Sequence, residues 1–467
     1  MASRSDFPLP AGRLEERFAD KHPLYSAGQA AAESSRCLYC FDAPCIPACP
    51  TAIDIPTFIH KIATRNLAGA ARTILESNLL GASCARVCPV EILCEGACVY
   101  VPWGRPAIAI GRLQRYAMEE GASPQLLEKA PRSGRSVGLV GAGPASLACA
   151  GTLALLGHEA VVYERDALPG GLNTTGVAPY KLPVADTLRE VEFLQRLGVK
   201  IETKVEIGRD LHGSELLRRH DAVFLGAGLG SDVPLAVPGA EGPGVVGALE
   251  WIRRMKLDPK TTLAGIRRAA VIGGGNTAID VARELARLGV AEVRLIYRRS
   301  AAEMPAYDHE WLEAKQDGVV LIPNAIVKEV IRQASRDGVG PGRPERLRLA
   351  VAKDGKPTNE ERASIQVDKV IVAIGRSKAP GFVAEFTGVS VDDAGSVRVE
   401  PGTGRTGNPR VFAGGDAANG GKEVVHAVAE GQAAARAIDA MLREGSLVRE
   451  TASSRERRPA GRSPYDE

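Results

Sequence analysis

Aromatic residues are scarce in this chain of 467 residues, at 4% of the total. Their scarcity argues against the stacking platforms that bind single-stranded nucleic acids. An excess of one charge is also lacking, because 59 Lys and Arg residues face 56 Asp and Glu residues and leave a net charge of +3. This balance marks neither a nucleic-acid binder nor a membrane-surface binder. No run approaches the roughly 18 uninterrupted apolar residues of a membrane-spanning helix.

The N-terminal sequence MASRSDFPLPAGRLEERF has no apolar core of the kind found in secretory signals. We therefore expect a cytoplasmic protein that binds neither membrane nor nucleic acid. In a reducing compartment, clustered thiols are metal ligands or redox groups rather than disulfides. The length predicts two to four domains, and the 51 glycines suit the turns of nucleotide-binding α/β units.

Cysteine is absent after Cys149, which we expect to be a buried helical thiol, and the other eight cysteines form two N-terminal groups. Each group contains a Cys-Pro pair, and closely spaced thiolates of this kind are typical of iron–sulfur clusters. A zinc module would require paired C-x2-C knuckles or Cys and His at ligand spacing, whereas only one C-x2-C is present and His60 stands alone. A purely structural role is the third interpretation. The groups are Cys37, Cys40, Cys45 and Cys49, and Cys84, Cys88, Cys94 and Cys98.

The segment RSVGLVGAGPASLACAGTLALLGHEAVVYERD predicts a strand, a glycine turn, a helix to about Leu156 and a second strand over 160–163. The turn contains Gly141, Gly143 and Pro144, and the second strand ends at Glu164. Turn glycines let backbone N–H groups and the helix N-terminus reach a pyrophosphate, while the acidic residue accepts from a ribose hydroxyl. This context predicts a dinucleotide-binding domain.

The pattern recurs in AAVIGGGNTAIDVARELARLGVAEVRLIYRRS, with Gly273 and Gly275 in the turn and a helix from about Thr277. The second strand, over 293–297, is followed by Arg298 and Arg299 instead of an acid. Two guanidinium groups favour the 2′-phosphate of NADPH. A solvated basic strand end is the alternative, and paired arginines also occur where NADH is used.

Two apolar strands that stop at glycine, over 222–228 and 370–376, flank the second dinucleotide fold. A later segment, VFAGGDAANGGKEVVHAVAEGQAAARAI, predicts a strand, the turn 414–416 and a helix that follows Asp416. The first dinucleotide domain is therefore predicted to be split, with the second inserted into it.

This organisation resembles the glutamate synthase small-subunit-like family of flavoprotein oxidoreductases over about residues 30–440. The resemblance rests on both cysteine groups and on the motifs GAGPASLACA, YERDALPGG, GGGNTAIDVA, YRRS with EMPA, and GGDAANGGKEVV. It implies an α/β fold in which an N-terminal helical domain with two 4Fe–4S clusters precedes two nested Rossmann-like domains for FAD and NAD(P)H. The segments GLNTTGVAPYKLP and NGGKEVVHAVAEGQAA are most similar to the PreT-type subunit of bacterial dihydropyrimidine dehydrogenase.

The resemblance also implies which residues ligate the clusters and which contact FAD and NAD(P)H. It gives Cys84 no ligand role. It assigns cluster 1 to Cys37, Cys40, Cys45 and Cys98, and cluster 2 to Cys49, Cys88, Cys94 and Gln114. It assigns FAD to Gly141, Gly143, Pro144, Ala145, Ser146, Glu164, Gly171, Leu172, Lys181, Gly415, Asp416, Lys422, Glu423 and Val424. For NAD(P)H it gives Gly274, Gly275, Asn276, Thr277, Arg298, Arg299, Ala373, Ile374 and Gly375, and it places Asp280 near the flavin as the catalytic candidate. The family's lysine beside flavin N5 has no ungapped match, since Lys204 is one position away.

The expected domains are helical iron–sulfur over 1–125, FAD over 133–250 and 371–445, NAD(P)H over 251–370, and a disordered tail over 446–467. No C-x-x-C lies near the second nucleotide domain, which excludes thioredoxin-reductase-like chemistry. No segment remains for a (β/α)8 barrel. We therefore expect hydride transfer from NADPH, or NADH, to FAD and single-electron transfer through the clusters to a PreA-like partner that carries FMN and iron–sulfur clusters and reduces uracil or thymine. The alternatives are a glutamate synthase small subunit, a stand-alone NADPH:acceptor oxidoreductase, and a non-catalytic assembly subunit.

Overall fold

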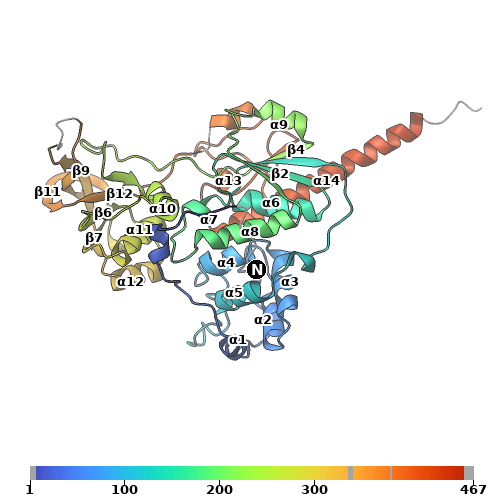
Figure 1. Ribbon diagram of the computed structural model, residues 1–467, viewed down its shortest axis with the longest axis horizontal. Coiled ribbons are helices and arrows are strands. Elements are labelled where there is room, and N and C mark those ends of the chain that lie inside the picture. Colours follow the sequence, from blue (N-terminus) through green and yellow to red (C-terminus); the bar gives the residue numbers. More distant parts are fainter. Residues whose placement is uncertain (1–6, 335–339, 379–380, 457–467) are drawn as a thin grey trace, which may run out of the picture. The chain divides into compact units, whose positions relative to one another are not determined.

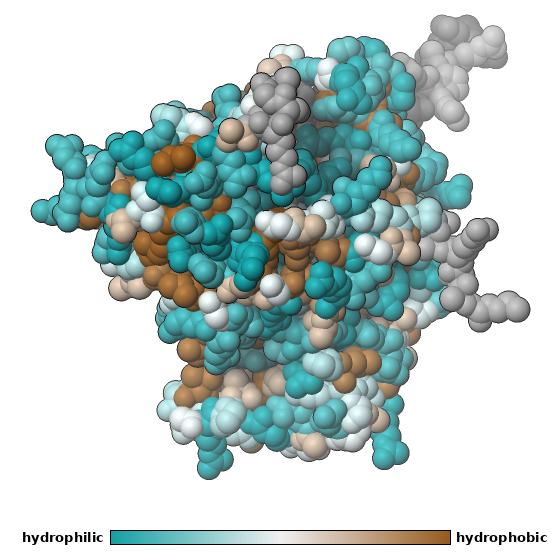
Figure 2. All heavy atoms as spheres, turned by 60° about the vertical axis from the view of Figure 1, so that its left-hand side comes forward, coloured by the Kyte–Doolittle hydropathy of each residue, from teal (hydrophilic) through white to brown (hydrophobic). Residues whose placement is uncertain are grey.

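The computed structural model describes residues 7–334, 340–378 and 381–456. They fall into two compact units (Figure 1). Unit 1 comprises the described residues up to Leu24 together with Gly170–Arg189 and Leu229–Lys378, and unit 2 comprises the other described residues. No helix in these described ranges is both long enough and apolar enough to cross a membrane. Hydrophilic residues cover much of the face displayed in Figure 2, and groups of hydrophobic residues also reach that surface.

The cysteine-rich part of unit 2 is a bundle of short helices. Polar side chains fix three helix starts, because Ser26, Asp54 and Asn66 each accept a backbone N–H of the first turn. The second helix buries Phe58 and Ile62, which lie on one face at helical spacing. The helices are α1 (Ala27–Ser34), α2 (Ile55–Ala63), α3 (Leu67–Ser77), α4 (Gly81–Val87) and α5 (Ile110–Gly121).

Unit 2 also contains a five-stranded parallel sheet in the order β13-β4-β1-β2-β3. Its strands are β1 (Ser136–Val140), β2 (Glu159–Glu164), β3 (Lys200–Thr203), β4 (Ala222–Leu225) and β13 (Val411–Ala413). Helix α6 (Pro144–Leu155) links β1 to β2 and packs against α14 (Val424–Glu456). Helices α8 (Val184–Arg196) and α9 (Gly213–Arg219) precede β3 and β4.

Unit 1 is built on a second parallel sheet in the order β5-β12-β6-β7-β8. Its strands are β5 (Val245–Gly247), β6 (Arg268–Ile272), β7 (Glu292–Ile296), β8 (Val320–Ile322) and β12 (Lys369–Val372). Helices α10 (Ala248–Leu257), α11 (Asn276–Arg287) and α12 (Asp308–Gln316) belong to this unit. An antiparallel sheet of β9 (Ala325–Arg332), β10 (Pro344–Lys353) and β11 (Lys356–Gln366) follows β8. Along the chain, β13 of the first sheet comes after the last strand of the second sheet, β12. This order confirms the nested α/β fold.

The division into units differs from the expected domain boundaries. Strand β5 precedes residue 251 and β12 crosses residue 370, yet both pair within the second sheet. The segment Gly170–Arg189, predicted as part of the first dinucleotide domain, groups with unit 1. These boundaries depend on strand pairing and tertiary contacts, which local patterns do not contain.

Two other segments differ from the predictions. Asp416 begins α13 (Asp416–Asn419), a single turn, and left-handed Gly420 separates it from α14. The expected disordered tail began at 446, but α14 continues to Glu456, and residues 457–467 lie outside the described residues. Between the helical bundle and β1, the short 3-10 helix η2 (Pro124–Leu126) follows the end of α5.

Candidate functional site

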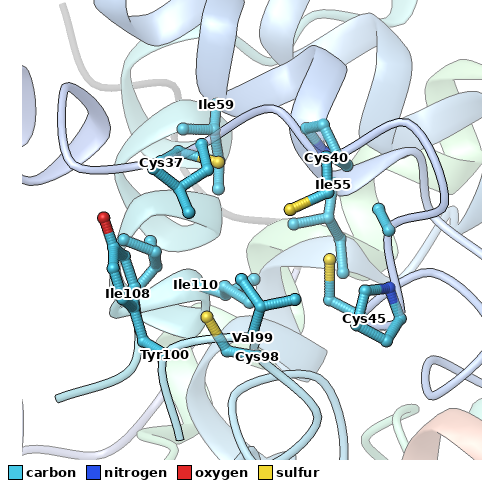
Figure 3. Close-up of a pocket in the computed structure, with 14 residues that line it drawn as sticks. Cys37, Cys40, Cys45, Ile55, Ile59, Cys98, Val99, Tyr100, Ile108 and Ile110 are labelled. Carbon is cyan, nitrogen blue, oxygen red and sulfur yellow. The ribbon is translucent and has the colours of Figure 1, made fainter. Parts of the chain in front are cut away.

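Four cysteines of unit 2 face one cavity. The thiols of Cys37, Cys40, Cys45 and Cys98 surround a common space whose walls are largely apolar (Figure 3). Ile55 and Ile59 of α2 form part of that wall. The structure therefore brings together all four residues predicted for cluster 1, although Cys98 lies more than 50 residues from Cys45 in the sequence.

Backbone turns position these thiols. Helix α1 ends just before Cys37, whose N–H donates to Ser34 (3.2 Å), and the Cys98 N–H donates to Glu95 (3.0 Å). Burial raises the pKa of the Cys37 thiol, and burial together with neighbouring Cys37 raises the pKa of Cys45 to about 12. Cluster assembly must therefore displace protons from these thiols.

The four cysteine thiols around the cavity are the type of ligand that an iron–sulfur cluster requires. In the ranges that the structure describes, no three metal-ligating side chains are placed to hold one metal ion. The four thiols instead line different parts of the cavity wall. Four thiolates around an apolar space suit a cuboidal cluster, in which each iron takes one thiolate. Which thiols bind iron stays a prediction.

The second cysteine group lies on and after α4. Cys49, Cys88 and Cys94 are close enough to influence one another electrostatically, and the pKa of Cys88 is raised by its hydrogen bond with Cys84 and by burial. Cys84, left without a ligand role by the sequence, therefore contacts a predicted ligand. Gln114 on α5 is buried, and its side-chain amide donates to the Gly81 carbonyl (2.8 Å). Because the amide nitrogen is the donor in this bond, the predicted ligand role of Gln114 would fall to its amide oxygen.

The turn after β1 has the geometry of a dinucleotide site. Gly141 has φ +83°, and a Cβ there would approach the Ala227 Cα within 3.0 Å, so only glycine suits this position. Buried Glu164 accepts from the N–H groups of Ala142 (2.7 Å) and Asp166 (2.8 Å). Each carboxylate oxygen keeps a second lone pair, so a ribose hydroxyl can still be bound. Pro144, Ala145 and Ser146 form the first turn of α6 behind Gly143.

The C-terminal part of this site is held by a residue that the sequence analysis missed. The Glu430 carboxylate of α14 accepts from the Gly415 N–H (2.7 Å) and from the Asn419 side chain (3.0 Å). It thereby fixes the turn that carries Asp416. No local pattern marked Glu430, because it follows Gly415 by 15 residues. The remaining predicted FAD residues here, Lys422, Glu423 and Val424, lie between α13 and the first residue of α14.

The turn after β6 also has a glycine at a position where neighbouring atoms leave no room for a side chain. A Cβ at Gly274 would lie 2.5 Å from the Tyr297 ring, so a larger residue would displace that ring. The Asn276 side chain accepts from the Tyr307 N–H (3.0 Å), and the Gly274 carbonyl accepts from Ala306 (3.1 Å). These bonds fix the turn against the EMPA segment. Gly275 caps α11, and Thr277 follows in its first turn.

Arg298 and Arg299 are exposed, and buried Tyr297 separates them from the end of β7. The Arg299 carbonyl accepts from Asn324 (2.9 Å), which fixes the backbone while both guanidinium groups extend from exposed residues. Ala373, Ile374 and Gly375 follow β12, and the Gly375 carbonyl accepts from Val233 (2.9 Å). The predicted NAD(P)H residues therefore all belong to unit 1.

The predicted FAD residues are divided between the units, because Gly171, Leu172 and Lys181 group with unit 1. Within that unit, Lys181 Nζ lies 2.7 Å from both the Asp280 and the Glu310 carboxylates. Tyr180 also donates to Asp280 (2.8 Å). Burial lowers the pKa of Lys181, but the two carboxylates outweigh it, so the pKa is raised and the side chain is a cation. Lys181 and Asp280 are thus partners of each other.

A second buried lysine was missed by the sequence analysis. Lys256 of α10 is 0% exposed, and its ammonium donates to the carbonyls of Asn173 (3.1 Å), Val177 (2.9 Å) and Leu182 (2.9 Å). Burial lowers the pKa of Lys256 to about 8. The cation satisfies three carbonyls in and after α7 (Leu172–Thr175), which carries Leu172. It therefore positions the backbone of this segment within unit 1.

Comparison with protein families gives two matches. Residues 14–125 match the family described as dihydropyrimidine dehydrogenase domain II, 4Fe-4S cluster. Residues 135–431 match the pyridine nucleotide-disulphide oxidoreductase family. These matches support iron–sulfur, FAD and NADPH as cofactors of the chain.

Similar proteins cover nearly the whole chain. The NAD-dependent dihydropyrimidine dehydrogenase subunit PreT of Escherichia coli (strain K12) is 34% identical over 420 residues, which are 89% of this chain and 95% of that protein. The glutamate synthase [NADPH] small chain of Halomonas elongata is 33% identical over 92% of this chain and 94% of its own length. Among solved structures, FprA from Mycobacterium tuberculosis in complex with NADPH has a TM-score of 0.54 at 21% identity, over 69% of this chain and 86% of FprA. That likeness supports the fold.

Proposed function

Because this chain belongs to the pyridine nucleotide-disulphide oxidoreductase family, within the group of PreT subunits and glutamate synthase small chains, we propose that it is the electron-input subunit of an NAD(P)-dependent dihydropyrimidine dehydrogenase. The family matches support an NAD(P)-dependent oxidoreductase with FAD and iron–sulfur chemistry. The observation that carries the proposal is the convergence of Cys37, Cys40, Cys45 and Cys98 on one cavity, in a chain that aligns with 95% of PreT.

The proposed reaction is NAD(P)H + H⁺ + uracil → NAD(P)⁺ + 5,6-dihydrouracil, with thymine as the other substrate. Two electrons and two protons are added across the pyrimidine double bond, and this addition takes place on a partner subunit with FMN and iron–sulfur clusters. A bound FAD would supply the conversion of a hydride into single electrons, and bound clusters would supply one-electron carriers. The hydride step needs no general acid from the chain.

The residues of the chain itself would bind and orient the cofactors. The first turn of α6 would hold a dinucleotide pyrophosphate, because glycine at 141 and 143 leaves room for its close approach, and Glu164 would hold the ribose. The turn at Gly274 and the exposed Arg298 and Arg299 would hold NADPH, with the guanidinium groups on the 2′-phosphate. The apolar wall around the first cysteine group would keep water from the cluster.

A second candidate function is that of a glutamate synthase small subunit. It is favoured by the 33% identity with the Halomonas elongata small chain over 94% of that protein. Both functions require the same electron input, and they differ only in the partner that receives the electrons.

The test is an anaerobic assay of the cluster-loaded protein with each kind of partner. NADPH oxidation is followed with a PreA-type subunit plus uracil, and separately with a glutamate synthase large subunit plus glutamine and 2-oxoglutarate. The proposal predicts uracil-dependent oxidation with the first partner only. Oxidation that requires glutamine and 2-oxoglutarate would replace it with the second candidate function.

A further inference from the structure

Large hydrophobic side chains are exposed mainly in the cysteine-rich part of unit 2. Of the ten such residues found in the described parts of the chain, six lie between residues 38 and 103. Phe41 is fully exposed at 101%, and Trp103 is 61% exposed. Large apolar side chains that are exposed close together can form binding surfaces. Five of them form what we call the cysteine-rim patch: Leu38, Tyr39, Phe41, Val101 and Trp103.

The patch comes from two loops that are tied together. Arg36 donates to the carbonyls of Pro106 (2.6 Å) and Ala107 (3.4 Å), and the Tyr100 hydroxyl donates to the Arg36 carbonyl (2.9 Å). The Arg36 guanidinium lies over the Tyr100 ring, and Trp103 meets that ring edge-on at 5.9 Å. These contacts hold the two loops next to each other.

The same loops carry three of the cavity thiols. Leu38, Tyr39 and Phe41 flank Cys37 and Cys40, whereas Val101 and Trp103 follow Cys98. Leu38 and Tyr100 also line the cavity itself. The loops that carry the exposed patch residues therefore also carry three thiols of the first cysteine site, which Figure 3 shows around the cavity.

The patch is held in shape. The Tyr39 hydroxyl donates to the Ser34 carbonyl (3.3 Å), and its ring meets His60 edge-to-face at 5.0 Å. Tyr39 keeps this pose with φ +50°, a backbone conformation that tyrosine rarely adopts. Rigid aromatic side chains lose little entropy on association, so such a surface is prepared for binding.

We propose that the cysteine-rim patch is the docking surface for the protein that receives single electrons from this chain. The inference rests on the proposed function, because it assumes that electrons leave through the first cysteine group. The occupant is a separate protein with its own one-electron centre beneath an apolar surface, since the patch is rich in aromatic side chains and its loops carry three of the cavity thiols. Aromatic residues dominate the energetic centre of interfaces, and electron-transfer complexes need only modest interface areas.

The test uses the cluster-loaded full chain and the variant Phe41→Ser/Trp103→Ser. The matched control is Leu312→Ser, a residue of unit 1 that is 52% exposed. Binding to a PreA-type subunit and to a glutamate synthase large subunit is measured by surface plasmon resonance. NADPH oxidation by ferricyanide, a small acceptor that needs no docking surface, and bound iron are measured in parallel.

The proposal expects the double variant to keep its iron and its ferricyanide rate within twofold, while its Kd for whichever partner the unaltered chain binds rises at least tenfold. The control should match the unaltered chain in all readouts. An unchanged Kd of the double variant for the partner would overturn the proposal. The proposal would also fail if the only change in the double variant were a loss of self-association or a loss of binding to phosphatidylglycerol vesicles. If the unaltered chain binds a partner but fails with uracil, the proposed function fails while the docking surface is still tested by that Kd.

Discussion

The Nζ atom of Lys181 lies 2.7 Å from the carboxylate of Asp280, and both side chains are largely buried. The resemblance placed these two residues at a flavin, Lys181 as a contact and Asp280 as the catalytic candidate. Within unit 1 they neutralise each other, and Tyr180 adds a hydrogen bond to the same Asp280 oxygen. The ion pair fastens Gly170–Arg189 to α11.

Replacing Asp280 tests this structural role. Asp280→Asn should lower the melting temperature by roughly 5–10 °C, because removing one partner of a buried ion pair costs about 3–5 kcal/mol. The ferricyanide-coupled NADPH turnover should fall less than threefold, and Lys181→Met should behave alike. A loss of turnover above a hundredfold at an unchanged melting temperature would instead establish Asp280 as catalytic.

The same network predicts a pH dependence. Burial alone would raise the pKa of Glu310. The nearby cations Lys181, Lys21 and Arg283 outweigh burial and lower the pKa from 4.5 to about 2. A depressed carboxyl pKa stabilises the folded state above pH 4.5, and the contribution is lost as the pH falls towards 2. The difference between the two pKa values corresponds to about 3 kcal/mol at neutral pH.

Glu310→Gln should therefore lower the melting temperature by several degrees at pH 7 and by progressively less below pH 4.5. Thermal unfolding followed by circular dichroism across that range measures the effect. Glu120→Gln, on an exposed residue of α5, serves as the control. A deficit that stayed constant from pH 7 to pH 3 would contradict the assigned pKa.

Lys256 provides the third prediction. Lys256→Met leaves three carbonyls of the segment around α7 without their donor, at a cost of about 1–3 kcal/mol for each buried group, partly offset by removal of a buried charge. We expect a lower melting temperature and faster proteolysis between residues 172 and 182. The exposed Lys260→Met is the matched control. Unaltered proteolysis of that segment would refute the positioning role.

The arginine pair after β7 predicts cofactor preference. Arg298→Ala/Arg299→Ala should raise the KM for NADPH about tenfold or more and leave the KM for NADH nearly unchanged, because hydrogen bonds to charged groups contribute about 1.5–3 kcal/mol. Arg294→Ala, on the preceding strand, should leave both values unchanged. Steady-state kinetics with ferricyanide measures them. Equal effects on both nucleotides would indicate that the pair does not read the 2′-phosphate.

The parts of the fold that local chemistry determines were predictable. The helix that follows the first glycine turn was expected to end at about Leu156, and the structure ends α6 at Leu155. The grouping of Gly170–Arg189 with unit 1 was not predictable, because it depends on pairs such as Tyr180 and Asp280, 100 residues apart. The roles of Lys256 and Glu430 also depend on distant partners. The single turn at Asp416 had a local signal, since two glycines follow Asn419.

The central claim is that electrons leave this chain through the first cysteine group. The most direct test compares Cys45→Ser with Cys149→Ser, a buried thiol of α6 outside both cysteine groups, in uracil-dependent NADPH oxidation with a PreA-type partner. The account predicts that Cys45→Ser loses the signal of one 4Fe–4S cluster in electron paramagnetic resonance and at least 90% of uracil reduction, while ferricyanide reduction persists and Cys149→Ser behaves normally. Full uracil reduction by a Cys45→Ser protein that lacks that cluster signal would contradict it.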